Sequence, residues 1–75
     1  MSAPRYKTGQ PVKAGDAISY NGQKGRIKAI GDALLEWGKT KKEVEEGFIM
    51  VEFDNGALLS TKAGDNHLAL IAGTK

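Results

Sequence analysis

The chain has 75 residues, no cysteine and a formal net charge of +2. A single domain of this length buries only about 60–65% of its unfolded surface and has no room for a deep internal cleft, so we expect no enzyme that acts as a monomer. The lack of cysteine excludes disulfides, thiolate nucleophiles and cysteine-based zinc sites, and with one histidine we expect neither a metal nor a cofactor.

Both ends of the chain are polar, and we expect residues 1–10 and 73–75 to be flexible tails of a single domain that spans residues 1–75. The first ten residues lack the apolar stretch of a signal peptide, and no segment is long and apolar enough to span a membrane. A chain without these signals and without disulfides is predicted to be cytoplasmic and to have no membrane partner.

Ten glycines divide the chain into short segments, which is typical of a small β protein with tight corners. The first two strands are predicted over residues 16–20 and 25–30. Asn21-Gly22 lies between them and is the preferred pair for a two-residue hairpin turn, because both residues tolerate positive φ. We therefore expect a β-hairpin here.

Side-chain alternation assigns faces to these two strands. Ile18 and Tyr20 share one face of the first strand. In the second strand Ile27 and Ala29 are predicted to point one way. The side chains predicted to point the other way are Arg26, Lys28 and Ile30.

The stretch 33–47 admits three interpretations. Leu34, Trp37 and Val44 fall at helical spacing and indicate a helix along the whole stretch, which Gly38 would interrupt. Another interpretation makes residues 33–37 a short strand.

The third interpretation, which we favour, is a short helix near residues 41–46. Thr40 and Glu43 have the spacing of a capping box, in which the hydroxyl and the carboxylate each accept a hydrogen bond from a backbone N–H at the helix start. Gly47 stands where a glycine commonly ends a helix.

Three more strands complete the predicted sheet, over residues 48–53, 57–61 and 67–71. Asp54-Asn55-Gly56 supplies a turn between the first two of them. The side chains of this part predicted to face the core are Ile49, Val51 and Phe53. Five short strands with tight turns suit a small closed barrel, because closure removes exposed sheet edges.

The segment from Gly15-Asp16 through Lys24-Gly25 to Gly31 resembles the KOW motif of ribosomal and transcription-factor SH3-like barrels. The likeness covers about 17 residues, and residues 65–71 are similar to the closing strand of such barrels. The resemblance implies a mostly β fold, a five-stranded SH3-like barrel. The short helix that we expect between strands two and three is an insertion after Ile30 that departs from the usual pattern of this family. The resemblance also implies RNA or protein partners.

The layout of the chain is also similar to that of the plasmid-borne, trimethoprim-resistant type II dihydrofolate reductases, which build one active-site pore from four copies. Their signature is a Val-Gln-Ile-Tyr run that lines the pore. The corresponding strand here is Ala57-Leu58-Leu59-Ser60-Thr61, which lacks those polar and aromatic groups. An oligomeric enzyme of this kind is therefore only a remote alternative.

Charge is unevenly distributed along the chain. Residues 1–31 carry six basic side chains against one acidic, whereas residues 32–56 carry three basic against seven acidic. This asymmetry is typical of a basic binding face, and it equally suits self-association of a basic half with an acidic half. The candidate nucleic-acid contacts are Lys13, Tyr20, Lys24, Arg26 and Lys28.

Two interpretations of these residues stay open. Three basic side chains in alternation on one strand face would contact phosphates, with Tyr20 stacking on a base. The same alternation also describes a solvated strand face on which lysine and arginine discourage pairing between edges.

A second candidate set points to protein partners. Trp37 is either an exposed binding anchor or a cap on one end of the barrel. Phe48 and Met50 lie opposite the core face of their strand. They are either covered by the inserted helix through Leu34, Leu35 and Val44, which we favour, or exposed as a patch for homodimerisation.

Catalytic chemistry finds little support in the sequence. Ser60, Asp65 and His67 lie near one another along the chain, but no nucleophile-elbow pattern accompanies them. We expect a non-enzymatic binding module, for RNA or DNA through the basic hairpin or, alternatively, for a protein partner or a second copy.

Overall fold

The computed structural model describes residues 4–72. Within this range the chain forms five strands, one 3₁₀-helix (η1) and one short α-helix (α1). Their bounds, in chain order, are β1 Ala17–Tyr20, β2 Gln23–Ala29, η1 Gly31–Trp37, α1 Lys41–Glu45, β3 Phe48–Phe53, β4 Leu58–Lys62 and β5 Leu68–Ala72.

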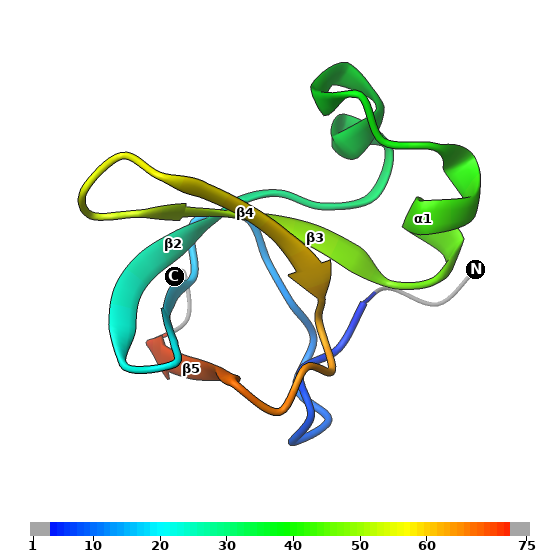
Figure 1. Ribbon diagram of the computed structural model, residues 1–75. Coiled ribbons are helices and arrows are strands. Elements are labelled where there is room, and N and C mark those ends of the chain that lie inside the picture. The colour runs from blue at the N-terminus through cyan, green and yellow to red at the C-terminus, as the bar shows by residue number, and fades with distance from the viewer. Residues whose placement is uncertain (1–3, 73–75) are drawn as a thin grey trace.

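All five strands belong to one antiparallel sheet with the order β4-β3-β2-β1-β5. The sheet is strongly coiled, so that the paired strands β3 and β4 lie on one side of the interior and β5 lies on the other (Figure 1). The two helical segments, drawn in green, lie together at one end of the sheet (Figure 1). The predicted mostly β chain of five strands with an inserted short helix is confirmed.

The predicted hairpin turn is confirmed. Asn21 and Gly22 both have positive φ, of 52° and 85°, which is the conformation that a two-residue turn of the favoured twist requires. The two residues join β1 to β2, which pair from Tyr20 opposite Gln23 to Ala17 opposite Arg26.

The predicted facing of β2 is wrong beyond Ile27. The register of β2 on β3 shifts between Ile27 and Ala29, so Lys28 is an extra residue in the ladder. Such a bulge reverses the alternation that follows it. Ile27 therefore faces the main core, Ala29 faces the opposite side, and Ile30 packs against the main core instead of pointing away from it.

The main core fills the concave side of the sheet. The predicted inward positions of β3 are confirmed, because Ile49 and Val51 are fully buried and Phe53 is nearly so. Further buried members of this cluster come from every part of the described chain except the helical segments. They are Tyr6, Val12, Ile18, Ile27, Ala63 and Leu68.

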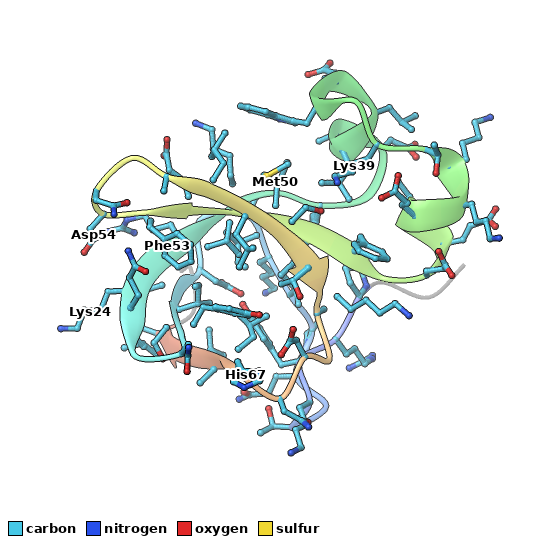
Figure 2. The ribbon with its side chains drawn as sticks, viewed as in Figure 1. Lys24, Lys39, Met50, Phe53, Asp54 and His67 are labelled. Atoms are coloured by element: carbon cyan, nitrogen blue, oxygen red, sulfur yellow. The ribbon has the colours of Figure 1, made fainter. Side chains whose placement is uncertain are left out.

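A second, smaller cluster covers part of the opposite side, which we call the outer face. Met50 packs there with Ala29 and Leu34, and Val44 and Phe48 pack against them. Figure 2 shows Met50 and Phe53 on opposite sides of β3. The favoured expectation that Leu34 and Val44 cover this side of β3 is confirmed for Met50, which is buried, whereas Phe48 is only half-buried. Leu35 is instead 38% exposed.

The helical segment follows the third interpretation. Thr40 caps α1, its hydroxyl accepts a hydrogen bond from the Glu43 N–H at 3.2 Å, and the Glu43 carboxylate accepts from the Thr40 N–H at 3.1 Å. One continuous helix is wrong, because Gly38 adopts a left-handed φ of 82° and ends η1. A strand over residues 33–37 is also wrong, since η1 occupies that stretch.

The expectation of a flexible tail over residues 1–10 is wrong for residues 4–10. Tyr6 is only 3% exposed, and its hydroxyl donates a hydrogen bond of 2.7 Å to the buried carboxylate of Asp16. Burial, followed by the bond to Asp16, raises the pKa of Tyr6. Arg5 also forms an antiparallel bridge with Pro11. Residues 1–3 and 73–75, the rest of the expected tails, lie outside the described residues.

The close approach of β2 and β3 at Gly25 gives a testable prediction. A Cβ added there would lie 2.7 Å from the carbonyl oxygen of Glu52, so Gly25→Ala must push the two strands apart. We expect a loss of about 1–3 kcal/mol in the free energy of unfolding, measured by urea denaturation. Gly64→Ala is the control, because a Cβ there meets no atom within 4 Å. Equal stability of the two variants would contradict the packing described here.

Candidate binding surface

The exposed part of the outer face carries the basic side chains of β2. Lys24, Arg26 and Lys28 are all exposed, and their neighbours Gly25 and Ile27 are buried. Figure 2 shows Lys24 pointing away from the body of the protein. The structure thus places these three predicted residues on one surface, which we call the basic strand face.

Small side chains and acidic side chains border the basic strand face on opposite sides. On β1, Ser19 lies opposite Lys24 and Ala17 opposite Arg26, so little covers the cations on that side. On β3, Glu52 lies opposite Arg26, and its carboxylate is 3.9 Å from the ammonium group of Lys28. An exposed ion pair at this distance adds little stability, but it lowers the positive charge of this side.

Trp37 extends the basic strand face with an aromatic ring. It is the last residue of η1, and the Lys28 ammonium nitrogen lies 6.0 Å from its ring centroid. The Trp37 side chain is 41% exposed, which favours the exposed anchor over the cap. Within η1, Leu34 is the residue that is buried against the sheet.

Tyr20 does not join the basic strand face. It shares the face of Ile18, and its ring centroid lies 6.4 Å from that of Phe53 and 5.9 Å from that of His67.

Lys13 is exposed on the loop before β1. It adds a cation near the far end of β2, since the N–H of Gly15, two residues along, bonds the Ile27 carbonyl at 2.8 Å. Of the predicted nucleic-acid contacts, Tyr20 is the one that the structure separates from the others.

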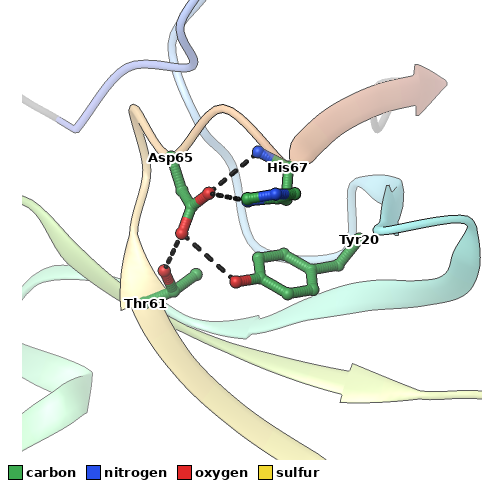
Figure 3. Close-up of polar contacts among 4 residues, drawn as sticks. All are labelled: Tyr20, Thr61, Asp65 and His67. Carbon is green, nitrogen blue, oxygen red and sulfur yellow. Dashed lines mark hydrogen bonds and ion pairs between the residues drawn. The ribbon is translucent and has the colours of Figure 1, made fainter.

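The polar group of Tyr20 belongs to a cluster centred on Asp65, which the sequence analysis did not identify (Figure 3). One carboxylate oxygen, Oδ2, accepts hydrogen bonds from the hydroxyls of Thr61 at 2.8 Å and Tyr20 at 3.3 Å. The other, Oδ1, accepts from the backbone N–H of His67 at 2.8 Å and lies 3.2 Å from the His67 Nδ1. The carboxylate thereby connects β1, β4 and the start of β5.

These contacts favour the ionised carboxylate. The His67 N–H and then the Thr61 hydroxyl lower the pKa of Asp65 to about 2.

Ser60, Asp65 and His67 do not form a catalytic triad. The buried Ser60 Oγ has no hydrogen-bond partner, while Asp65 and His67 pair with each other. These contacts therefore stabilise the fold and do not activate Ser60 as a nucleophile.

An open groove of about 760 Å³ lies beside this cluster, between the N-terminal segment, the end of α1 and the end of β4. Its walls carry both Arg5 and Lys62 and both Glu45 and Glu46, so it presents no single sign of charge.

Nowhere in the described part of the chain do three potential metal-binding side chains of the His, Cys, Asp or Glu type gather.

Among residues 4–72, no helix combines the length and the apolar character needed to cross a membrane.

The chain matches no family model, no curated protein and no solved structure.

The depressed pKa of Asp65 predicts how stability depends on pH. A carboxylate with a folded pKa of about 2 and an ordinary value of 3.8 stabilises the fold above pH 3.8, and this contribution is lost as the pH falls towards 2. We expect Asp65→Asn to be less stable than the wild type at pH 7 and the difference to shrink between pH 4 and pH 2. Thermal unfolding followed by circular dichroism at a series of pH values measures this.

Asp32→Asn is the control for that experiment, because it removes an exposed carboxylate from η1 and leaves the Asp65 cluster intact. It should retain the acid sensitivity of the wild type. If Asp65→Asn retains it as well, the Asp65 cluster does not stabilise the fold in the way described.

Proposed function

We propose that the chain is an SH3-like barrel whose first hairpin is KOW-like. Three features support this assignment: the antiparallel order β4-β3-β2-β1-β5, the bulge at Lys28 that bends β2, and the Asp65 cluster that links β4 to the start of β5. A bulged central strand allows a five-stranded sheet to coil until its outer strands approach each other.

We further propose that the protein is a non-enzymatic module that binds single-stranded RNA or DNA on the basic strand face. One observation carries this proposal: Trp37, an exposed aromatic ring, stands directly beside Lys28 at the end of a row of cations. Single-stranded nucleic acids are bound by this combination, in which cations contact phosphates and an aromatic ring stacks on an unpaired base.

The assignment of roles follows from position. Lys24 and Arg26 face solvent beside small β1 side chains and are free to contact phosphates. Trp37 takes the stacking role that we first gave to Tyr20, and the Lys28 ammonium group lies over one side of its ring. Lys13 provides a further phosphate contact at the far end of β2.

The charges also set the strength of binding. Glu52 lies between the cations and β4. Asp54 lies beside Lys24 across the strands, because the Lys24 carbonyl accepts a hydrogen bond from the Asp54 N–H at 3.1 Å. With three cations on the face, we expect weak, sequence-tolerant binding whose log affinity falls with log salt concentration at a slope of about −2.

A protein partner is the second candidate, and the exposure of η1 favours it. Leu35 and Trp37 are 38% and 41% exposed on the same short element, and tryptophan and arginine are the residues most enriched in binding hot spots. In this case Trp37 would fill a pocket of the partner and Arg26 would lie at the rim. Met50 would take no part, because it is buried against Leu34 and Ala29. Phe48 is half-buried beside the groove, away from Trp37 in the sequence, and is not needed for this contact.

Titration of labelled protein with a mixed single-stranded oligonucleotide at low salt tests the first proposal. We expect amides of residues 20–30 and the Trp37 indole to shift, and the shifts to fade at high salt. Trp37→Ala should weaken binding by about 1–3 kcal/mol, and Arg26→Gln should reduce the salt slope by about 0.7.

Lys41→Gln removes an exposed charge from α1, away from the basic strand face, and should bind as the wild type does. If millimolar oligonucleotide shifts no amide at low salt, the nucleic-acid proposal is wrong and the protein-partner candidate replaces it.

A further inference from the structure

The outer edge of β4 has unpaired backbone groups. The Phe53 N–H bonds the Ala57 carbonyl at 2.8 Å, and the Ala63 N–H bonds the Gly47 carbonyl at 2.9 Å. In an antiparallel ladder every second residue bonds the neighbouring strand, so residues 59 and 61 bond β3. Leu58 and Ser60 consequently direct their backbone N–H and C=O groups away from β3.

Nothing in residues 4–72 occupies this edge. The sheet order ends at β4, and no described residue forms a hydrogen bond to the backbone of Leu58 or Ser60 on that side. Leu58 is 47% exposed, and β4 contains no proline. Its one charged residue is Lys62 at the C-terminal end, so residues 58–61 lack the charges and prolines that usually protect a sheet edge from an added strand.

We propose that β4 pairs with β4 of a second copy, antiparallel, about a two-fold axis at Leu59. In this register Leu58 lies opposite the partner's Ser60, and each pair exchanges both of its N–H···O=C bonds. The free groups of the edge are thereby satisfied without any change in the pairing of β4 with β3. Leu59 meets the partner's Leu59 on the concave side, where Leu59 is half-buried.

Charge complementarity favours a second copy over an unrelated strand. With the axis at Leu59, Lys62 falls opposite Gly56 of the partner's β3–β4 turn, and Asp54 belongs to the same turn, at the end of β3. Both side chains are exposed, and neither forms an ion pair within residues 4–72. The two-fold axis repeats this contact, and no two like charges are placed opposite each other.

This inference does not depend on nucleic-acid binding, because it uses the edge of β4 and not the basic strand face. Sedimentation equilibrium between micromolar and millimolar concentration tests it. The mass should rise from 8.0 kDa towards twice that value.

Leu58→Pro removes the outward N–H of residue 58 without removing a bond to β3, and it should raise the dissociation constant of the dimer about tenfold or more. Leu58→Thr keeps that N–H and should dimerise more tightly than Leu58→Pro.

A charge swap distinguishes pairing of β4 between two copies from a loss of folding stability within one copy. Lys62→Glu and Asp54→Lys should each weaken the dimer, because each places like charges together across the interface, and the double variant should restore it. Within one copy Asp54 lies in the turn before β4 and Lys62 at the far end of β4, so a contact inside one copy would not give this rescue. A monomeric mass at millimolar concentration, unchanged dimerisation of Leu58→Pro, or no rescue would overturn the proposal.

Discussion

The Asp65 carboxylate links the connection between β4 and β5 to β1, because Tyr20, its partner on β1, lies 45 residues away in the sequence. Its two oxygens accept hydrogen bonds from Tyr20 of β1, from Thr61 of β4 and from the backbone that leads into β5. A chain of 75 residues has few other means of holding the far ends of a coiled sheet near each other, since its core is thin and it has no disulfide. Strand alternation places Tyr20 on the inner face with Ile18, where its hydroxyl reaches Asp65. The outer face carries the cations of β2 and Trp37.

Local sequence signals predicted the local structure well. Asn21-Gly22 specifies its turn by backbone conformation alone, and Thr40 with Glu43 specifies the start of α1 through bonds within one turn. Alternation in β3 placed its inward side chains correctly for the same reason, because strand periodicity needs no knowledge of distant residues.

The features that sequence reasoning missed all depend on distant contacts. The bulge at Lys28 is set by the register of β2 on β3, and no residue type marks it. The docking of Tyr6 onto Asp16 was hidden by the polar composition of the N-terminal segment. The contact of Trp37 with Lys28 arises only because η1 turns back over the sheet between two left-handed glycines, so the cations were identified and their aromatic neighbour was not.

The most direct test of this account is the titration of the Asp65 carboxyl group, followed by carbon-detected NMR of its side chain. The account predicts a midpoint of about pH 2, accompanied by shifts of the His67 amide, because hydrogen bonds to the carboxylate must break as it gains a proton. A midpoint near the ordinary value of 3.8 would show that Asp65 does not hold β1, β4 and β5 together in solution.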